Sequence, residues 1–248
     1  MLRRETGPGY DILRLEHGKA SALDLELCVA LESAFAELAA SPPPALLITG
    51  RDAIFCAGVD LLRLKTGGEG YVAEFLPALT RAIEAMVQLP MPVVAAVNGH
   101  AIAGGCILAL AADHVVAAEG KGRIGVPELL VGVPFPRIGL ELVRARAGDA
   151  ATRRLTLTGA AVPFDEARTM GLVDDCVSPP ELMAHAEGVA LRLAAIPAVT
   201  FAVHKRQLRA PILALVGDGE VDRDVHAAWS RPEVLAAVDA FVQRTLRK

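Results

Sequence analysis

The sequence predicts an α/β fold in which strands alternate with helices, followed by a purely helical C-terminal region. Apolar runs such as 45–49 and 93–97 are continuous rather than alternating, which is typical of strands in a sheet covered on both faces. Stretches with helical spacing of apolar residues separate these runs as far as about Val177, and this alternation is typical of α/β proteins. After Ser178 only helical patterns remain.

Local signals place the elements along the chain. Asp24 has the character of a helix N-cap, and prolines at 42–44 stop the helix that follows it. Residues 50–60 are expected to form a loop, and residues 98–103 a turn. The predicted strands cover 10–16, 45–49, 93–97, 113–118 and 123–126, and the predicted helices cover 24–41, 71–88 and 104–112.

Composition limits the class of protein. The chain has 248 residues, which suggests one large domain or a domain with an appendage. Its 53% of apolar residues suffice for a large core, built from Ala, Leu and Val because there are only 7 Phe, 2 Tyr and 1 Trp. The net charge of −4 argues against a nucleic-acid-binding protein, which would carry a basic excess.

The cysteines and the termini favour a reduced, cytoplasmic protein. No cysteine pair has C-x-x-C spacing and no histidines cluster with them, so we expect buried free thiols and no metal site. The residues after Met1 lack the apolar segment of a signal peptide. The apolar stretch 92–112 is interrupted by Asn98 and several glycines, which indicates a strand, a turn and a helix rather than a membrane span. The four cysteines are Cys28, Cys56, Cys106 and Cys176.

Two glycine-containing loops, 55–61 and 98–106, each follow a predicted buried strand. Small residues at a strand end let a ligand approach the backbone. A helix that starts at Gly104 also presents unpaired N–H groups and its positive dipole end to that ligand. Two such donors aimed at one point would form an oxyanion hole. Either loop taken alone is equally consistent with a tight turn, and neither has the pattern of a phosphate-binding or dinucleotide-binding loop.

The ordered set of motifs resembles the enoyl-CoA hydratase/isomerase (crotonase) superfamily. The matching motifs extend over roughly residues 10–180 in the family's order. They are Phe55-Cys56-Ala57-Gly58-Val59-Asp60-Leu61, Pro92 to Gly99, Ala103-Gly104-Gly105-Cys106, Ala111-Ala112-Asp113, Pro127-Glu128-Leu129-Leu130-Val131-Gly132, Thr158-Gly159 and Ala167 to Val173.

The resemblance implies a fold, a site and an assembly. Residues 1–178 would form a spiral of ββα repeats, and residues 179–248 a helical trimerisation region. The N–H groups of Val59 and Gly104 would be the oxyanion donors for an acyl-CoA thioester. The protein would form a homotrimer or a dimer of trimers, and coenzyme A would enter as part of the substrate, with no other cofactor. The remaining substrate-binding positions would be Ala57, Asp60, Leu61, Leu62, Ile107 and Pro136.

Three positions indicate which reaction of this superfamily the resemblance predicts. Hydratases of this superfamily use two glutamates around a water; one matches Glu128, whereas Ile107 occupies the place of the other. A glycine N–H that holds the water in hydratases is replaced by Pro136, which has no N–H. We expect Glu128, among apolar neighbours, to have a raised pKa. The resemblance therefore predicts a Δ3,Δ2-enoyl-CoA isomerase with Glu128 as the single proton shuttle.

Alternatives stay open within and outside this reaction. A hydratase with a displaced acid, thioester hydrolysis and a catalytically silent acyl-CoA-binding protein are also compatible with the motifs. Asp60 is expected to cap the following helix rather than to orient the loop, and His100 to have a turn or packing role. The basic run 204–209 is predicted to be a solvated face, or by resemblance a contact to CoA phosphates. Ser21 stands where the family usually has Asn, a mild change beside the CoA nucleotide.

Overall fold

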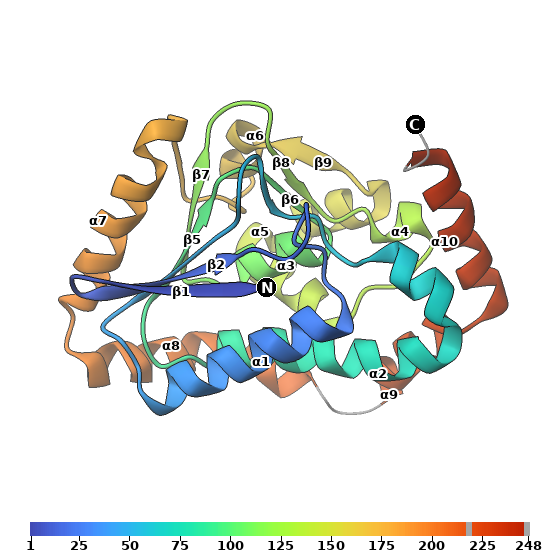
Figure 1. The fold of residues 1–248 in the computed structure, drawn as a ribbon, viewed down its shortest axis with the longest axis horizontal. Coiled ribbons are helices and arrows are strands. Elements are labelled where there is room, and N and C mark those ends of the chain that lie inside the picture. Colours follow the sequence, from blue (N-terminus) through green and yellow to red (C-terminus); the bar gives the residue numbers. More distant parts are fainter. Residues whose placement is uncertain (217–219, 246–248) are drawn as a thin grey trace.

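The computed structural model describes residues 1–216 and 220–245 (Figure 1). Its strands form two sheets, one of six strands and one of four. The strands are β1 (Leu2–Gly7), β2 (Tyr10–Leu15), β3 (Leu46–Thr49), β4 (Ile54–Cys56), β5 (Val93–Val97), β6 (His100–Ile102), β7 (His114–Ala118), β8 (Arg123–Gly125), β9 (Ala161–Pro163) and β10 (Asp175–Val177).

Helices surround these sheets and form all of the described chain after β10. They are α1 (Leu25–Ala40), α2 (Leu61–Val87), α3 (Gly104–Leu110), α4 (Glu128–Val131), α5 (Arg137–Thr158), α6 (Phe164–Thr169), a 3₁₀ turn (Pro179–Glu181), α7 (Leu182–Ala194), α8 (Ala198–Leu215), α9 (Glu220–Trp229) and α10 (Pro232–Thr245). The predicted α/β class and the helical C-terminal region are thus confirmed.

The main sheet has the order β1-β2-β3-β5-β7-β10 and is parallel except for its edge strand β1. Its central strands β3 and β5 are buried along their whole length, as the continuous apolar runs predicted. Alternate residues face two separate cores. Leu46 and Ile48 belong to the larger core with α1 and α2, whereas Leu47 packs with apolar residues of α7 on the opposite face.

Helix boundaries follow local capping chemistry. The carboxylate of Asp24 accepts the N–H of Leu27 at 2.8 Å, which confirms the predicted N-cap of α1. The prediction of a helix over 71–88 was too short, because α2 begins at Leu61 and is interrupted only at Gly68, which has a φ of +60°. The chain is therefore helical on both sides of this break.

The smaller sheet has the order β4-β6-β8-β9 and supports the two glycine-containing loops. Segments 50–60 and 98–103, predicted as loop and turn, contain the short parallel strands β4 and β6. The side chain of Asn98 ties them together, since its Nδ2 donates to the carbonyl of Asp52 at 2.9 Å and its Oδ1 accepts the N–H of Gly50 at 2.9 Å. The loops that leave β4 and β6 are therefore held side by side.

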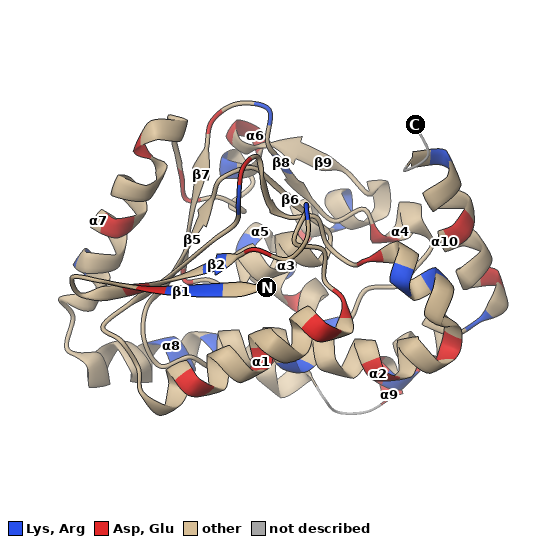
Figure 2. Ribbon diagram, in the orientation of Figure 1, with Lys and Arg blue, Asp and Glu red and all other residues tan. Residues whose placement is uncertain are grey.

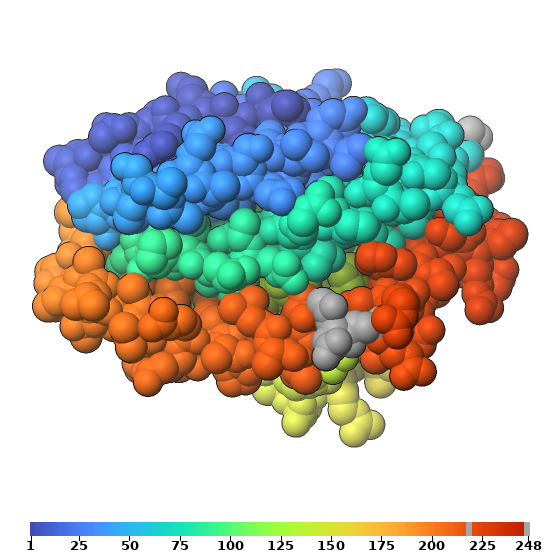
Figure 3. Space-filling model, turned by 90° about the horizontal axis from the view of Figure 1, so that it is seen from below, coloured from blue at the N-terminus to red at the C-terminus, as the bar shows by residue number. Residues whose placement is uncertain are grey.

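The C-terminal helices pack on the rest of the same chain. Figure 1 shows α7 beside the main sheet, and Figure 3 shows the C-terminal helices running alongside α2. The basic run 204–209 is not wholly a solvated face, which corrects that prediction: Lys205 and Arg209 are only 4% and 9% exposed. The Lys205 ammonium donates to Asp113 at 2.7 Å, and Arg209 donates to the carbonyl of Ala112 at 2.8 Å, so both anchor α8 to the end of α3.

Charges of both signs are interspersed on the outer helices (Figure 2). Within the described residues, no single helix has the length and apolar character of a membrane span. The segments Pro179–Ala194 and Ala198–Leu215 meet that standard only as a pair, bent by 103°.

Candidate functional site

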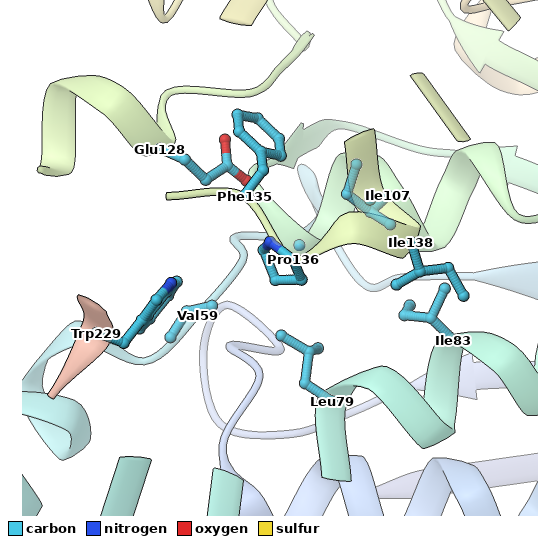
Figure 4. Close-up of a pocket in the computed structure, with 11 residues that line it drawn as sticks. Val59, Leu79, Ile83, Ile107, Glu128, Phe135, Pro136, Ile138 and Trp229 are labelled. Atoms are coloured by element: carbon cyan, nitrogen blue, oxygen red, sulfur yellow. The ribbon is translucent and has the colours of Figure 1, made fainter. Parts of the chain in front are cut away.

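A largely apolar pocket lies where the glycine-containing loops meet α2, α4, α5 and α9 (Figure 4). Five residues predicted for the site line it: Val59, Gly104, Ile107, Glu128 and Pro136. The structure therefore brings together segments that are far apart in the sequence. The other lining residues are Leu79, Ile83, Phe135, Ile138, Gly139 and Trp229.

Close backbone packing joins the two loops. Gly58 has a φ of +87°, and a Cβ atom there would lie 2.6 Å from the carbonyl oxygen of Ile102 and 3.3 Å from the nitrogen of Gly104. A Cβ atom on Gly105 would lie 2.1 Å from the carbonyl oxygen of Cys56. Any side chain at either position would force the loops apart. This pattern explains why glycines stand at these positions.

The backbone N–H groups of Val59 and Gly104 are free to bind a ligand. Leu23 forms backbone hydrogen bonds with the residues on either side of Val59. Its N–H donates to the carbonyl of Gly58, and its carbonyl accepts the N–H of Asp60. Gly104 opens α3, and the first N–H groups of a helix have no acceptor within it. Among the described residues, no backbone carbonyl accepts the N–H of Val59 or Gly104. The sequence predicted these two groups as oxyanion donors, and that role stays a prediction.

Ala103 sets the direction in which α3 starts. Its φ of +52° and ψ of −126° are rare for a residue with a side chain. Its N–H donates to the carbonyl of Gly125 at 2.8 Å, which fixes this conformation. Strained backbone of this kind costs of order 1–3 kcal/mol and is concentrated at functional sites. The strain lies directly before Gly104, where the chain turns from β6 into α3.

Glu128 supplies the ionisable side chain of the pocket. It is the first residue of α4 and is only 7% exposed. Among the described residues, its Oε2 atom is buried without a hydrogen-bond partner. Burial raises the pKa of this carboxyl group from its ordinary value of 4.5 to about 8. Glu128 is therefore a group that can hold or release a proton near neutral pH.

The wall around Glu128 offers it no second acid or base. Ile107, 5% exposed, lies in α3 and presents only carbon atoms. Pro136 precedes α5 and has no N–H to donate. The indole N–H of Trp229 donates to the carbonyl of Pro134 at 2.8 Å, so it is already occupied. Of the residues that line this pocket in the described chain, Glu128 alone is ionisable.

Other predicted positions lie outside the pocket. Asp60 is the N-cap of α2, since its carboxylate accepts the N–H groups of Leu62 and Arg63 at 3.0 Å. Ala57 and Leu62 are exposed, and Leu61 is half-buried at the start of α2. None of these four lines the pocket, so contact with the CoA part of a substrate stays a prediction for them.

The cysteine thiols are poor candidates for chemistry. Cys56 and Cys106 are buried, and burial raises their pKa values, that of Cys56 to about 12. Cys28 is also buried and Cys176 is half-buried. All four are free thiols, as expected. His100 lies in β6 and is half-buried, outside the residues that line the pocket.

Sequence reasoning missed the residues that close the pocket. Leu79 and Ile83 come from α2, Ile138 from α5 and Trp229 from α9. Helical periodicity marks Leu79 and Ile83 as inward-facing, but it does not tell which helix or cavity they meet. One indication in the sequence that Trp229 could matter is that it is the single Trp of the chain.

Two backbone N–H groups without a backbone acceptor and one buried carboxyl group thus lie along the same pocket of the described chain. The donors can stabilise negative charge on a carbonyl oxygen, and the carboxylate can remove a proton from an adjacent carbon. The family model for enoyl-CoA hydratase/isomerase matches residues 12–244. The chain therefore belongs to the enoyl-CoA hydratase/isomerase family, the crotonase superfamily.

Some relatives within this family are named as hydratases and others as isomerases. A putative enoyl-CoA hydratase of Thermus thermophilus is 35% identical over 227 residues, covering 90% of this chain and 87% of the relative. The peroxisomal enoyl-CoA delta isomerase 2 of Arabidopsis thaliana is 36% identical over 135 residues, covering 52% of this chain and 56% of the relative.

Solved structures show the same fold. Human mitochondrial delta3-delta2-enoyl-CoA isomerase superposes with a TM-score of 0.93 at 23% identity, covering 98% of this chain and 97% of that chain. The probable enoyl-CoA hydratase EchA3 of Mycobacterium tuberculosis gives a TM-score of 0.82 at 25% identity, covering 99% and 98%. The predicted crotonase fold is confirmed.

Proposed function

We propose that the protein is an enoyl-CoA isomerase that moves a double bond from the Δ3 to the Δ2 position, with Glu128 as its proton shuttle. The observation that carries this proposal is the solitary carboxyl group of the pocket. Hydration requires an acid–base arrangement that positions and splits a water. Ile107 and Pro136, which also line the pocket, supply neither a second carboxylate nor a free N–H.

The proposed reaction uses Glu128 twice and the two backbone N–H groups throughout. The carboxylate of Glu128 removes a proton from C2 of a 3-enoyl thioester, and the electron pair moves onto the thioester oxygen to form a dienolate. The N–H groups of Val59 and Gly104 stabilise that oxygen. Glu128 then returns its proton to C4, and the double bond forms between C2 and C3. No cofactor is needed beyond the CoA of the substrate.

The raised pKa of Glu128 suits both halves of this cycle. A carboxyl group with a pKa of about 8 is a stronger base than an ordinary glutamate, yet it still releases its proton readily. We expect kcat/KM to rise with pH and to level off above the pKa of Glu128 in the free enzyme. A plot of log(kcat/KM) for 3-hexenoyl-CoA against pH measures this pKa directly.

The decisive experiment compares two substrates with two variants. The wild-type protein should convert 3-hexenoyl-CoA to 2-hexenoyl-CoA and leave crotonyl-CoA unhydrated. Glu128→Gln keeps the size of the side chain and should lower isomerisation by about 10²–10⁴-fold. Glu119→Gln is the matched control, because Glu119 is exposed and lies outside the pocket. Full isomerase turnover by Glu128→Gln would disprove the assignment.

Hydration is the second candidate function, favoured by the name of the Thermus relative. It predicts that crotonyl-CoA gains water at a rate above that of 3-hexenoyl-CoA isomerisation. Tight acyl-CoA binding without turnover of either substrate would instead identify a catalytically silent binding protein. The homotrimeric or hexameric assembly and the cytoplasmic location belong to the proposal, and light scattering coupled to gel filtration measures the former.

A further inference from the structure

The pocket beside Glu128 is small and closed by bulky apolar side chains. Figure 4 shows Trp229 on one side, and Ile83 and Ile138 on the other, with Leu79 below Pro136. The cavity measures about 30 Å³ and is partly open on one side. The walls therefore leave little room beyond the reacting carbons of a bound acyl chain.

Packing holds these walls in place. Ile83, Ile138 and Trp229 are each 2% exposed, and Leu79 is 6% exposed. Leu79 and Ile83 lie one turn apart on α2, which packs along α1. The hydrogen bond from Trp229 to the carbonyl of Pro134 fixes the indole ring next to the segment that carries Phe135 and Pro136. Side chains buried in this way do not swing aside without opening the core.

The chemistry of the walls restricts the ligand as much as their size. Apart from Glu128, the side chains that line the pocket are hydrocarbon or, for Trp229, have their polar atom already hydrogen-bonded. A hydroxyl or carboxylate at the far end of an acyl chain would lose its hydration without gaining a partner. The end of the chain that fits is therefore an unsubstituted alkyl group.

We propose that this site selects short, unsubstituted acyl thioesters, and that Leu79, Ile83 and Ile138 form the wall that stops longer chains. For scale, an apolar protein cavity of about 150 Å³ binds benzene, which has six carbons. The cavity beside Glu128, at about 30 Å³, has about one fifth of that volume, so it does not hold a long acyl chain. The proposal rests on the proposed function only in placing the acyl chain of a CoA thioester beside Glu128.

Binding of saturated acyl-CoA thioesters tests the length limit without any turnover. Acetyl-, butyryl-, hexanoyl-, octanoyl- and decanoyl-CoA are titrated into the wild-type protein by calorimetry. Affinity should rise about fourfold for each buried methylene up to hexanoyl-CoA. It should then fall by at least about tenfold at decanoyl-CoA, because the wall excludes the added carbons. Equal or tighter binding of decanoyl-CoA would overturn the proposal.

Two wall variants test the residues in opposite directions. Ile83→Ala enlarges the end of the pocket and should raise the affinity for decanoyl-CoA relative to butyryl-CoA by about tenfold or more. Gly139→Ala narrows it, since the added Cβ would lie 3.3 Å from Cγ1 of Ile107, and should weaken hexanoyl-CoA relative to acetyl-CoA. Leu157→Ala is the matched control, because Leu157 is 67% exposed on α5. Thermal unfolding confirms that each variant is folded.

The results separate this proposal from the proposed reaction. If the affinities fall beyond hexanoyl-CoA and both variants shift the profile as described, the length limit holds even for a protein that isomerises nothing. If Ile83→Ala and Gly139→Ala leave the relative affinities unchanged in folded protein, the assignment of the wall is wrong, whatever the activity on 3-hexenoyl-CoA.

Discussion

The site has two halves that are built in different ways. One half consists of backbone N–H groups at Val59 and Gly104, held by loops so tightly packed that a Cβ atom on Gly58 would collide with a carbonyl oxygen. The other half consists of side chains, those of Glu128, Ile107 and Pro136, which line the same pocket. The backbone half tolerates almost no substitution, whereas the side-chain half can change without moving the chain. Under the proposed function, a single fold would therefore keep its anion-stabilising half while the other half selects the reaction.

The largest expected loss of activity comes from displacing the backbone N–H groups of Val59 and Gly104. Gly58→Ala should lower kcat/KM by about 10²–10³-fold or more, because the added Cβ meets the carbonyl of Ile102 and displaces the donors. Gly70→Ala is the matched control, since a Cβ atom at that exposed helical position meets nothing within 4 Å. Steady-state isomerisation of both variants provides the comparison, and equal activity would contradict the role of the loops.

Glu128, the ionisable group of the side-chain half, should make the free energy of unfolding depend on pH. The folded-state pKa of Glu128, about 8, lies above its ordinary value of 4.5, so the folded protein holds this proton more tightly than the unfolded chain. The resulting stabilisation is full below pH 4.5 and is lost as the pH rises to about 8. Urea unfolding should show wild type losing roughly 1.4 kcal/mol per pH unit relative to Glu128→Gln across this window.

This stability experiment has a clear negative outcome. If the free energies of unfolding of wild type and Glu128→Gln run parallel between pH 4.5 and 8, Glu128 is not buried as an uncompensated acid in solution. Glu119→Gln again serves as the control, because Glu119 is exposed and lies outside the pocket.

A smaller effect is expected from converting the side-chain half to a different reaction. Ile107→Glu combined with Pro136→Gly would add a second carboxylate and a backbone N–H opposite Glu128. We expect crotonyl-CoA hydration to rise by about tenfold over either single variant, since both water-positioning groups are required together. Absorbance at the enoyl thioester band follows the reaction. Equal hydration by the single and double variants would show that these two positions do not decide the reaction.

The smallest expected effect comes from removing the backbone strain at Ala103, which lies directly before Gly104. Ala103→Gly should stabilise the protein by about 1 kcal/mol, because glycine adopts the φ of +52° without strain and this relief exceeds the cost of the entropy that the unfolded chain gains. Thermal unfolding measures this gain. Ala118→Gly, at a buried strand position with ordinary backbone geometry, should instead destabilise the protein.

Local chemistry explains what the sequence could predict. The caps at Asp24 and Asp60 and the two glycine-containing loops depend on neighbouring residues, and each lies where it was predicted. The edge strand β1 was missed, since its charged, half-exposed residues have no apolar run to mark them. The early start of α2 was missed because Gly67 and Gly68 favoured a loop.

Long-range packing explains the rest. The basic run was assigned to solvent because nothing in its own segment shows that Lys205 meets Asp113, a residue 92 positions away. Likewise, the roles of Leu79, Ile83 and Trp229 depend on how α2 and α9 converge on α5. Spacing in the sequence identifies such side chains as buried, but only the assembled helices show that they bound a cavity.

The position of Trp229 has a consequence for biosynthesis. The chain emerges from the ribosome with its N-terminal part first, and folding of the leading segments begins early. The loops at Val59 and Gly104 are then available long before α9, yet one wall of the pocket is Trp229. One face of the main sheet likewise stays bare until α7 has been made. A nascent chain lacking these helices would therefore expose apolar surface that the folded chain buries.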